Sequence, residues 1–63
     1  MSEFISLVHD GVVAETNDAV LFQFGLELAW IPKSLMNDYS DDEKYADVAG
    51  WFVEQEGLEG YEA

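Results

Sequence analysis

Carboxylates are the only side chains able to take part in catalysis or metal binding that are abundant in this sequence. Its 63 residues include fourteen aspartates and glutamates, but one histidine, two lysines, no arginine and no cysteine. The histidine, His9, precedes an Asp10-Gly11 turn, and none of the four serines lies in a motif that pairs it with a base, as nucleophilic catalysis requires. We therefore expect His9 to be a partly exposed turn residue and the protein not to be an enzyme.

The acidic run from 38 to 43 is the segment whose spacing comes closest to a metal site. A twelve-residue calcium loop starting at Asp38 needs oxygen ligands at its third and fifth places, a glycine at the sixth and a glutamate at the twelfth. The sixth place holds Glu43 and the twelfth holds Ala49. The pattern fails, so we expect no metal or other cofactor, and acids at the start of a helix explain this run better.

The distribution of charge is the sharpest functional signal. The formal net charge is −12; residues 1–36 hold five acids and one lysine, net −4, whereas residues 37–63 hold nine acids and one lysine, net −8. Such a surface attracts basic partners and repels nucleic acid and anionic membranes. A net charge of about 2–8 already keeps a small domain soluble. The excess indicates a binding face, with plain solubility as the competing interpretation.

On the binding hypothesis, the carboxylates imitate the phosphates of a nucleic-acid strand. Acids three or four residues apart on a helix, such as Glu43 and Asp47, lie about 5–6 Å apart at Cβ. Successive phosphates rise by about 3.4 Å along the axis of each strand and lie farther apart than that through space, so the two spacings are commensurate. The residues predicted to bind the partner are Asp38, Asp41, Asp42, Glu43, Asp47, Glu54, Glu56, Glu59 and Trp51.

The first half of the chain has the composition of an antiparallel sheet. Turn pairs at Asp10-Gly11 and Asn17-Asp18, and a glycine at Gly25, separate runs rich in β-branched and aromatic residues. We expect about four strands within residues 3–31, joined by short turns. Alternation places Val20, Phe22 and Phe24 on one face. A second alternating run places Leu26, Leu28 and Trp30 together, and we expect them in the core.

The second half supplies one helix to cover that sheet, over about 41–56 and most securely 50–56. Ser40 and Glu43 fit a capping box, and an apolar stripe at helical spacing runs from Tyr45 to Val53. Residues 41–49 also fit a turn and a short edge strand. Gly57 is a natural helix stop with an apolar residue after it. We expect one domain over 1–58 and a frayed acidic tail over 59–63.

Two further side chains have roles that the pattern leaves to be decided. Trp51 lies beside the apolar stripe, where it either seals the edge of the core or stands exposed as a binding anchor. Lys33 follows Pro32 at a strand end. Acidic surroundings raise the pKa of a lysine instead of lowering it for catalysis, so we expect Lys33 to form a solvated ion pair.

Two blocks of the sequence resemble a group of small phage and prophage proteins. Residues 29–34 read Ala-Trp-Ile-Pro-Lys-Ser, and residues 51–58 read Trp-Phe-Val-Glu-Gln-Glu-Gly-Leu. In that group a strand ends in Trp-Ile-Pro-Lys-Ser and a Trp-led helix ends in Gly-Leu, after a hairpin similar to residues 15–21 here. Such relatives often carry a proline before the helix tryptophan, where this chain has Ala49-Gly50. The group has no assigned function, so the resemblance implies a phage-type origin and a small sheet with one helix, but no reaction.

These observations favour a non-enzymatic α+β protein in the cytoplasm of an infected bacterial host. The start of the chain lacks the basic region and apolar run of a signal peptide or a membrane span. The expected partner is a basic, nucleic-acid-handling protein. By analogy with other small acidic phage proteins, the expected use is inhibition of a defence nuclease such as a CRISPR effector. The alternative is a structural or assembly adaptor whose sheet edge pairs with another phage protein or a second copy, as a homodimer.

Overall fold

The computed structural model describes residues 3–63 as antiparallel strands followed by one C-terminal helix, α1 (Gly50–Glu56). Two short 3-10 helices, η1 (Lys33–Leu35) and η2 (Glu59–Tyr61), lie before β5 and after α1. The α+β class and the C-terminal helix are confirmed. The six strands are β1 (Phe4–Val8), β2 (Gly11–Glu15), β3 (Ala19–Phe24), β4 (Glu27–Pro32), β5 (Met36–Ser40) and β6 (Tyr45–Ala49).

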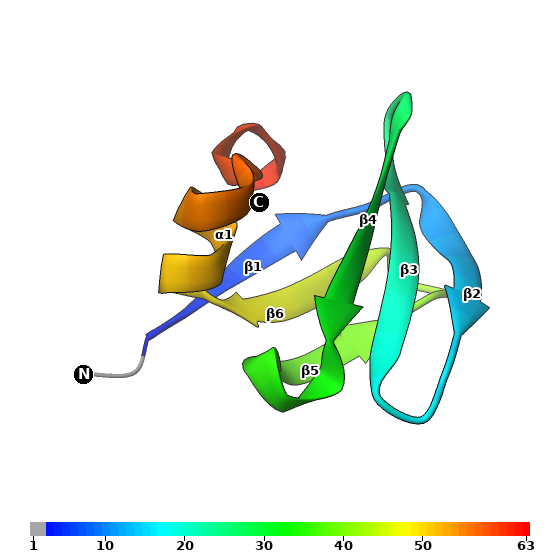
Figure 1. Cartoon of the computed structure of the whole chain (residues 1–63). Coiled ribbons are helices and arrows are strands. Elements are labelled where there is room, and N and C mark those ends of the chain that lie inside the picture. Colours follow the sequence, from blue (N-terminus) through cyan, green and yellow to red (C-terminus); the bar gives the residue numbers. More distant parts are fainter. Residues whose placement is uncertain (1–2) are drawn as a thin grey trace.

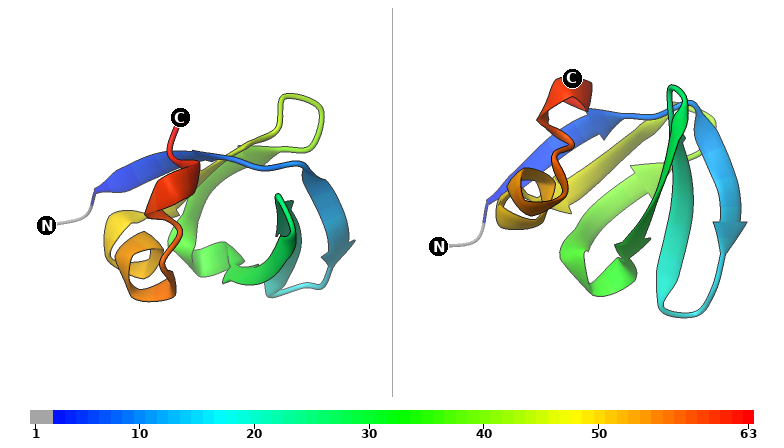
Figure 2. Two further views of the ribbon diagram at one scale, coloured as in Figure 1. Left: turned by 90° about the horizontal axis from the view of Figure 1, so that it is seen from above. Right: turned by 45° about the horizontal axis from the view of Figure 1, so that its top comes forward.

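The strands form two three-stranded antiparallel sheets instead of one meander. One sheet has the order β1-β6-β5 and the other β2-β3-β4. Figure 1 shows the two sheets side by side with α1 next to β1 and β6. The turned views in Figure 2 show the sheets curving around a shared interior, with α1 at one side of it. The four strands expected in the first half are all present, but they belong to two different sheets.

Local turn chemistry explains the sheet β2-β3-β4. Asn17-Asp18 turns the chain between β2 and β3, as predicted, and Thr16 accepts the backbone amides of Asp18 and Ala19 on its hydroxyl. The β3–β4 turn has two residues, with Gly25 at φ +61°. A glycine with positive φ at the first position is the signature of a type II′ hairpin turn, whose twist matches the flanking strands.

The Asp10-Gly11 pair does not close a hairpin between β1 and β2, and that prediction was wrong. β1 pairs with β6 and β2 pairs with β3. Asp10 instead ties the corner between the sheets to the β3–β4 hairpin. Its amide donates to the carbonyl of Gln23 over 2.7 Å, and its carboxylate accepts from the amide of Gly25 over 2.6 Å. The turn signal predicted a change of direction without specifying the strand that pairs next.

Residues 41–49 form the turn and the strand that were the alternative to a helix. The amide of Glu43 donates to the hydroxyl of Ser40 over 3.0 Å, so the hydrogen bond expected of a capping box exists but closes a turn. Lys44 completes the reversal at φ +62°. β6 then lies at the centre of its sheet and not at an edge. The helix expected over 41–56 is therefore confined to its last seven residues.

The core combines side chains from both sheets and from α1. Val20, Phe22 and Phe24 are fully buried, which confirms the face predicted from their alternation. α1 adds Phe52 and Val53 to the same cluster. The remaining buried apolar residues are Leu7, Ile31, Ala46, Val48 and Leu58.

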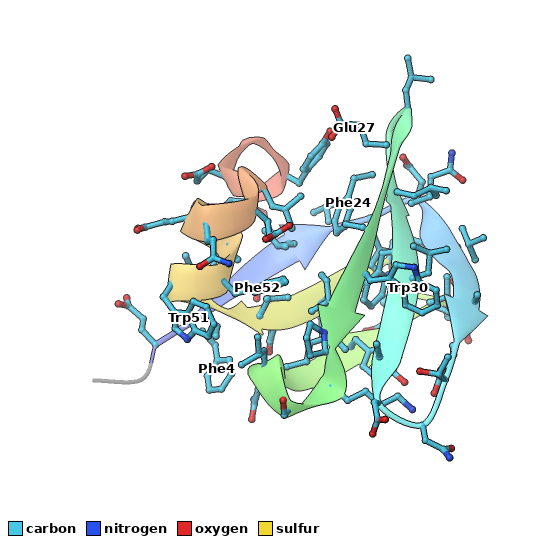
Figure 3. All side chains as sticks on the ribbon, viewed as in Figure 1. Phe4, Phe24, Glu27, Trp30, Trp51 and Phe52 are labelled. Carbon is cyan, nitrogen blue, oxygen red and sulfur yellow. The ribbon has the colours of Figure 1, made fainter. Side chains whose placement is uncertain are left out.

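The expectation that Trp30 is in the core was wrong. Trp30 is 48% exposed, and Leu28 and Leu26 are 57% and 102% exposed. The alternation along β4 is real, but the opposite face is the buried one, with Ile31 inward and Ala29 packed against the core. Leu26 lies in the tight turn and not in the strand. Figure 3 labels Trp30 on the β2-β3-β4 sheet, away from Phe52 and Trp51.

His9 is buried, contrary to the expectation of a partly exposed turn residue. Its side chain is 2% exposed and its ring centroid lies 4.5 Å from that of Phe22. Nε2 lies 3.0 Å from the carbonyl oxygen of Ser40 and 3.2 Å from that of Tyr45. Both partners are acceptors, so they assign a hydrogen to Nε2. His9 therefore fastens the start of β2 to the β5–β6 turn.

The helix stop at Gly57 is as predicted. Gly57 has φ +72°, and the amide of Leu58 donates to the carbonyl of Val53 over 2.9 Å, which is the long bond of a Schellman cap. The tail over 59–63 differs from the frayed segment that we expected. η2 lies within it, Tyr61 packs on the core, and the last amide, of Ala63, donates to a carbonyl of β1 over 2.9 Å.

Candidate functional site: an acidic cluster on the outer sheet face

Two carboxylates meet on the outer face of the β1-β6-β5 sheet. Asp38 on β5 and Asp47 on β6 occupy directly opposite positions in the antiparallel register. Residues in such positions have Cβ atoms about 4.5–5.5 Å apart, and like charges there are destabilising. Ala46 and Val48, on either side of Asp47, are buried, so the alternation of the strand turns Asp47 away from the core.

Hydroxyl and amide donors hold these two carboxylates in place. The hydroxyl of Ser6 on β1 donates to Oδ1 of Asp47. The hydroxyl of Tyr45 donates to Oδ2 of Asp38 over 2.7 Å, and the amide of Tyr39 donates to its Oδ1 over 2.8 Å. These donors are neutral, so they orient the carboxylate oxygens without neutralising their charge.

Tyr45 reports a third carboxylate close by. Its pKa is raised to about 12, first by the hydrogen bond that its hydroxyl donates to Asp38 and then by desolvation and by the charges of Asp38, Glu43 and Asp47. Each of these negative charges disfavours a phenolate beside it. We call Asp38, Glu43 and Asp47 the acidic cluster. Asp38 lies on β5, Asp47 on β6 and Glu43 in the turn between them, and Ser6 on β1 orients Asp47.

The raised pKa of Tyr45 makes a prediction for alkaline titration. We expect tyrosinate absorbance to show Tyr45 ionising near pH 12 and Asp38→Asn to move that step toward pH 10, with Tyr45→Phe identifying the signal. An unfolded tyrosine ionises at about pH 10. The folded state therefore keeps this proton when the unfolded state has lost it. The stabilisation is complete below pH 10 and is lost as the pH rises toward 12. An unmoved step in Asp38→Asn would contradict the assigned hydrogen bond.

Both lysines of the chain are engaged elsewhere. Nζ of Lys33 lies 2.7 Å from Oε2 of Glu15, and Nζ of Lys44 lies 3.5 Å from Oδ1 of Asp41. The hydrogen bond to Glu15 raises the pKa of Lys33, and the hydrogen bonds from Lys33 and Tyr39 lower the pKa of Glu15. The ion pair expected for Lys33 is confirmed. Within residues 3–63, neither lysine forms an ion pair with the acidic cluster.

Not all the predicted binding residues gather at this cluster. Asp41 accepts from the amide of Val12 over 3.1 Å, which lowers the pKa of Asp41 and makes it a structural link to β2. Asp42 is exposed in the β5–β6 turn next to the cluster. The helical spacing expected between Glu43 and Asp47 does not exist, because the first lies in a turn and the second in a strand. Cross-strand pairing provides the close approach instead.

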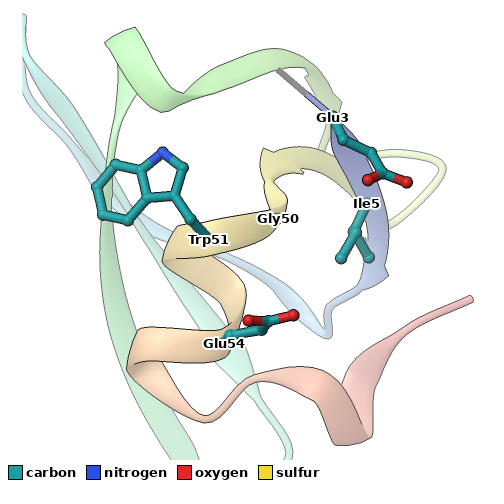
Figure 4. A pocket seen from close by; sticks show the side chains of 5 residues that line it. All are labelled: Glu3, Ile5, Gly50, Trp51 and Glu54. Atoms are coloured by element: carbon teal, nitrogen blue, oxygen red, sulfur yellow. The ribbon is translucent and has the colours of Figure 1, made fainter. Parts of the chain in front are cut away.

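The remaining predicted residues lie on α1 and η2. Trp51 is 58% exposed. Of the two positions considered for it, it therefore stands exposed and does not seal the edge of the core. Glu54 lines a hollow of about 350 Å³ together with Glu3, Ile5, Gly50 and Trp51. Figure 4 shows the carboxylate of Glu54 on the side of Ile5, with the indole of Trp51 pointing the other way. The last two predicted residues, Glu56 and Glu59, are exposed beyond this hollow along the chain.

Of the two hydroxyl donors, sequence reasoning missed Ser6 and assigned Tyr45 to the core. The signal that could have found them is the period of two in β6. Once Tyr45 and Asp47 are read as outward residues of a strand, the hairpin brings Asp38 opposite Asp47. The helical interpretation placed Tyr45 in the apolar stripe and so removed it from the polar face.

The described part of the chain lacks some other kinds of site. Residues 3–63 contain no group of three or more His, Cys, Asp and Glu side chains arranged to hold a metal ion. Among the helices described, none is long and apolar enough to cross a membrane. Comparisons with protein-family models, curated proteins and solved structures found no significant match, so the resemblance to small phage proteins stays a prediction.

Proposed function

We propose that this protein is a non-enzymatic binding domain whose acidic cluster occupies a cationic, nucleic-acid-binding site on a partner protein. The cluster presents two carboxylates on an outward sheet face and a third, Glu43, in the adjoining turn, and the chain as a whole has a net charge of −12. Lysine and arginine side chains that bind phosphates also bind carboxylates, through the same charge-assisted hydrogen bonds. A partner with a nucleic-acid groove is therefore the class that fits best.

The observation that supports this proposal most strongly is the direct pairing of Asp38 with Asp47. Solubility needs negative charge somewhere on the surface, but it does not need two carboxylates at opposed positions of one hairpin. That placement lowers stability, and neither lysine compensates it. A sequence commonly breaks such a local rule at a functional site. A partner that supplies a cation between the two carboxylates would relieve the repulsion, and this relief would contribute to the free energy of binding.

The position of His9 supports a binding role over an enzymatic one. A general base must reach the proton that it removes with an available nitrogen. Nε2 of His9 already faces two backbone carbonyls, and the ring is buried against Phe22. The other nitrogen, Nδ1, is buried without a hydrogen-bond partner among residues 3–63, so neither nitrogen of this imidazole is open to a substrate in solvent. If the partner is a nuclease, competition with DNA or RNA makes this protein an inhibitor of it, and a CRISPR effector is one such nuclease.

Capture from a bacterial lysate at two salt concentrations tests the proposal. We expect immobilised wild-type protein to retain a basic nucleic-acid-binding protein at low salt. Excess duplex DNA or about 0.5 M salt should release it, because screening weakens contacts between exposed charges. The protein alone should bind neither DNA nor RNA. Retention that resists both salt and nucleic acid would contradict an electrostatic, phosphate-like mode of binding.

A further inference from the structure

The four strand edges of the two sheets are protected unequally. β1 is covered by the C-terminal residues, through a bridge between Leu7 and Glu62 and the bond from Ala63 to Ser6. β2 has an irregularity in its register near Val13. It also has one amide, of Val12, satisfied by a carboxylate. Bulges, charges and covering segments are the devices by which proteins keep edges from pairing.

The edge of β5 is protected, whereas the edge of β4 is not. β5 has an irregularity between Met36 and Asp38 and carries the charge of the acidic cluster. β4 is the outermost strand of its sheet (Figure 1) and holds a single charged residue, Glu27, at its start. Its exposed residues, Leu28 and Trp30, are large and apolar. A long apolar edge of this kind is a template for another strand.

The hydrogen-bonding pattern shows which backbone groups of β4 are available. The carbonyl of Gln23 accepts a hydrogen bond on the β2 side, so the adjacent residues Phe22 and Phe24 direct their N–H and C=O groups to β4. Their partners on β4 are Ala29 and Glu27. By the same alternation Leu28 and Trp30 direct their N–H and C=O groups away from β3. The amide of Lys33 donates to the carbonyl of Asp18, just before β3, over 2.7 Å, as the same alternation requires.

We propose that β4 pairs antiparallel with β4 of a second copy of this chain, with Ala29 of each copy on the two-fold axis. This register sets Leu28 opposite Trp30 of the other copy and permits four backbone hydrogen bonds. A register centred on Trp30 would set Leu28 opposite Pro32, which has no N–H to donate. The result is a continuous six-stranded sheet with an isologous interface.

The sequence of β4 favours a second copy as the occupant of this edge, because in this register the edge is complementary to itself and holds few charges. Two molecules of net charge −12 repel each other most strongly when their acidic clusters approach. The β4 edge lies on the other sheet. Its Glu27 would face Ile31 of the second copy, so the register places no like charges opposite each other. The side chains of Leu28 and Trp30 then form two apolar cross-strand pairs, a favourable combination on a sheet face.

Sedimentation over about a hundredfold dilution series tests this interface by mass action. We expect wild type to move from 7.1 kDa toward twice that mass as concentration rises, and more readily in salt, which screens the repulsion. Leu28→Lys should raise the dissociation constant of the dimer about tenfold or more, because each change occurs twice in an isologous interface. The matched control is Leu26→Lys, with the same charge change at the exposed turn, and it should dimerise like wild type.

Amide exchange in wild type tests the same interface without any variant. The amides of Leu28 and Trp30 should exchange fast in dilute protein and slowly in concentrated protein, whereas that of Ala29 should be protected in both. A chain that stays monomeric throughout, as it would if the edge served a different protein, overturns the proposal. So does equal loss of the dimer in Leu26→Lys and Leu28→Lys, or protection that never reaches Leu28 and Trp30.

Discussion

Replacing Phe22 with alanine should leave the protein largely unfolded at room temperature. Phe22 is fully buried and packs its ring against His9 at 4.5 Å, Tyr39 at 5.8 Å and Phe24 at 6.1 Å. Truncating a buried phenylalanine costs about 3–5 kcal/mol. Domains are stable by about 0.05–0.15 kcal/mol per residue, or roughly 3–9 kcal/mol for a chain of this length. A chain this short buries a small share of its surface and lies at the marginal end of that range, where the substitution removes most or all of the stability.

Trp30→Ala is the matched control for that experiment. It removes a larger aromatic side chain, but one that is 48% exposed, so less apolar surface returns to water and the loss of stability should be clearly smaller than for Phe22→Ala. Urea unfolding followed by circular dichroism, in protein dilute enough to be monomeric, compares the two. A stable, cooperatively folded Phe22→Ala variant, or a Trp30→Ala variant that unfolds as readily, would show that the buried face has been assigned incorrectly.

The second large effect is expected from Asp38→Asn combined with Asp47→Asn. Asparagine keeps one oxygen that can accept from Ser6 at position 47 and from Tyr45 at position 38, although the bond from the amide of Tyr39 loses its acceptor. Removal of the like charges offsets that loss, so we expect the stability to stay close to that of wild type. Affinity for the cationic partner should fall about tenfold or more, equivalent to about 1.4 kcal/mol. Thermal unfolding and surface binding kinetics measure the two quantities. A variant that loses stability and affinity together would indicate a structural role for the pair.

The alternating run in β3 could be predicted because local and tertiary preferences agree there. Val20, Phe22 and Phe24 form the inward face of a strand that is central in its sheet. The stop at Gly57 was predictable for a similar reason, since the cap is made from residues next to each other in the chain. Features that depend on neighbouring residues alone were therefore available from the sequence.

The hairpin of β5 and β6 was not decided by the sequence because the same residues satisfy two periods. Tyr45, Val48 and Ala49 fit a helical stripe, while Ala46 and Val48 fit a strand with one buried face. The bond between Ser40 and Glu43 occurs in a helix cap and in a tight turn alike. What selects the strand is pairing with β1 and β5 on both sides, a contact between distant segments that periodicity does not register.

The candidate site followed from the same choice. The sequence correctly indicated an excess of acids in the second half, but the pairing of Asp38 with Asp47 exists only if residues 41–44 reverse the chain. Of the nine residues predicted to bind a partner, the structure brings Asp38, Glu43 and Asp47 around Tyr45 and leaves Glu54, Glu56, Glu59 and Trp51 on or after α1. Local sequence could not rank these two groups.

One measurement separates a specific acidic cluster from a general effect of charge. The affinity of the captured partner is measured for Asp38→Asn/Asp47→Asn and for Glu56→Gln/Glu59→Gln, two variants with the same net charge of −10, derived from −12 by removing two carboxylates. We predict that the first loses about tenfold or more in affinity and that the second stays close to wild type. Equal losses in the two variants would contradict the account, because net charge alone would then explain the binding.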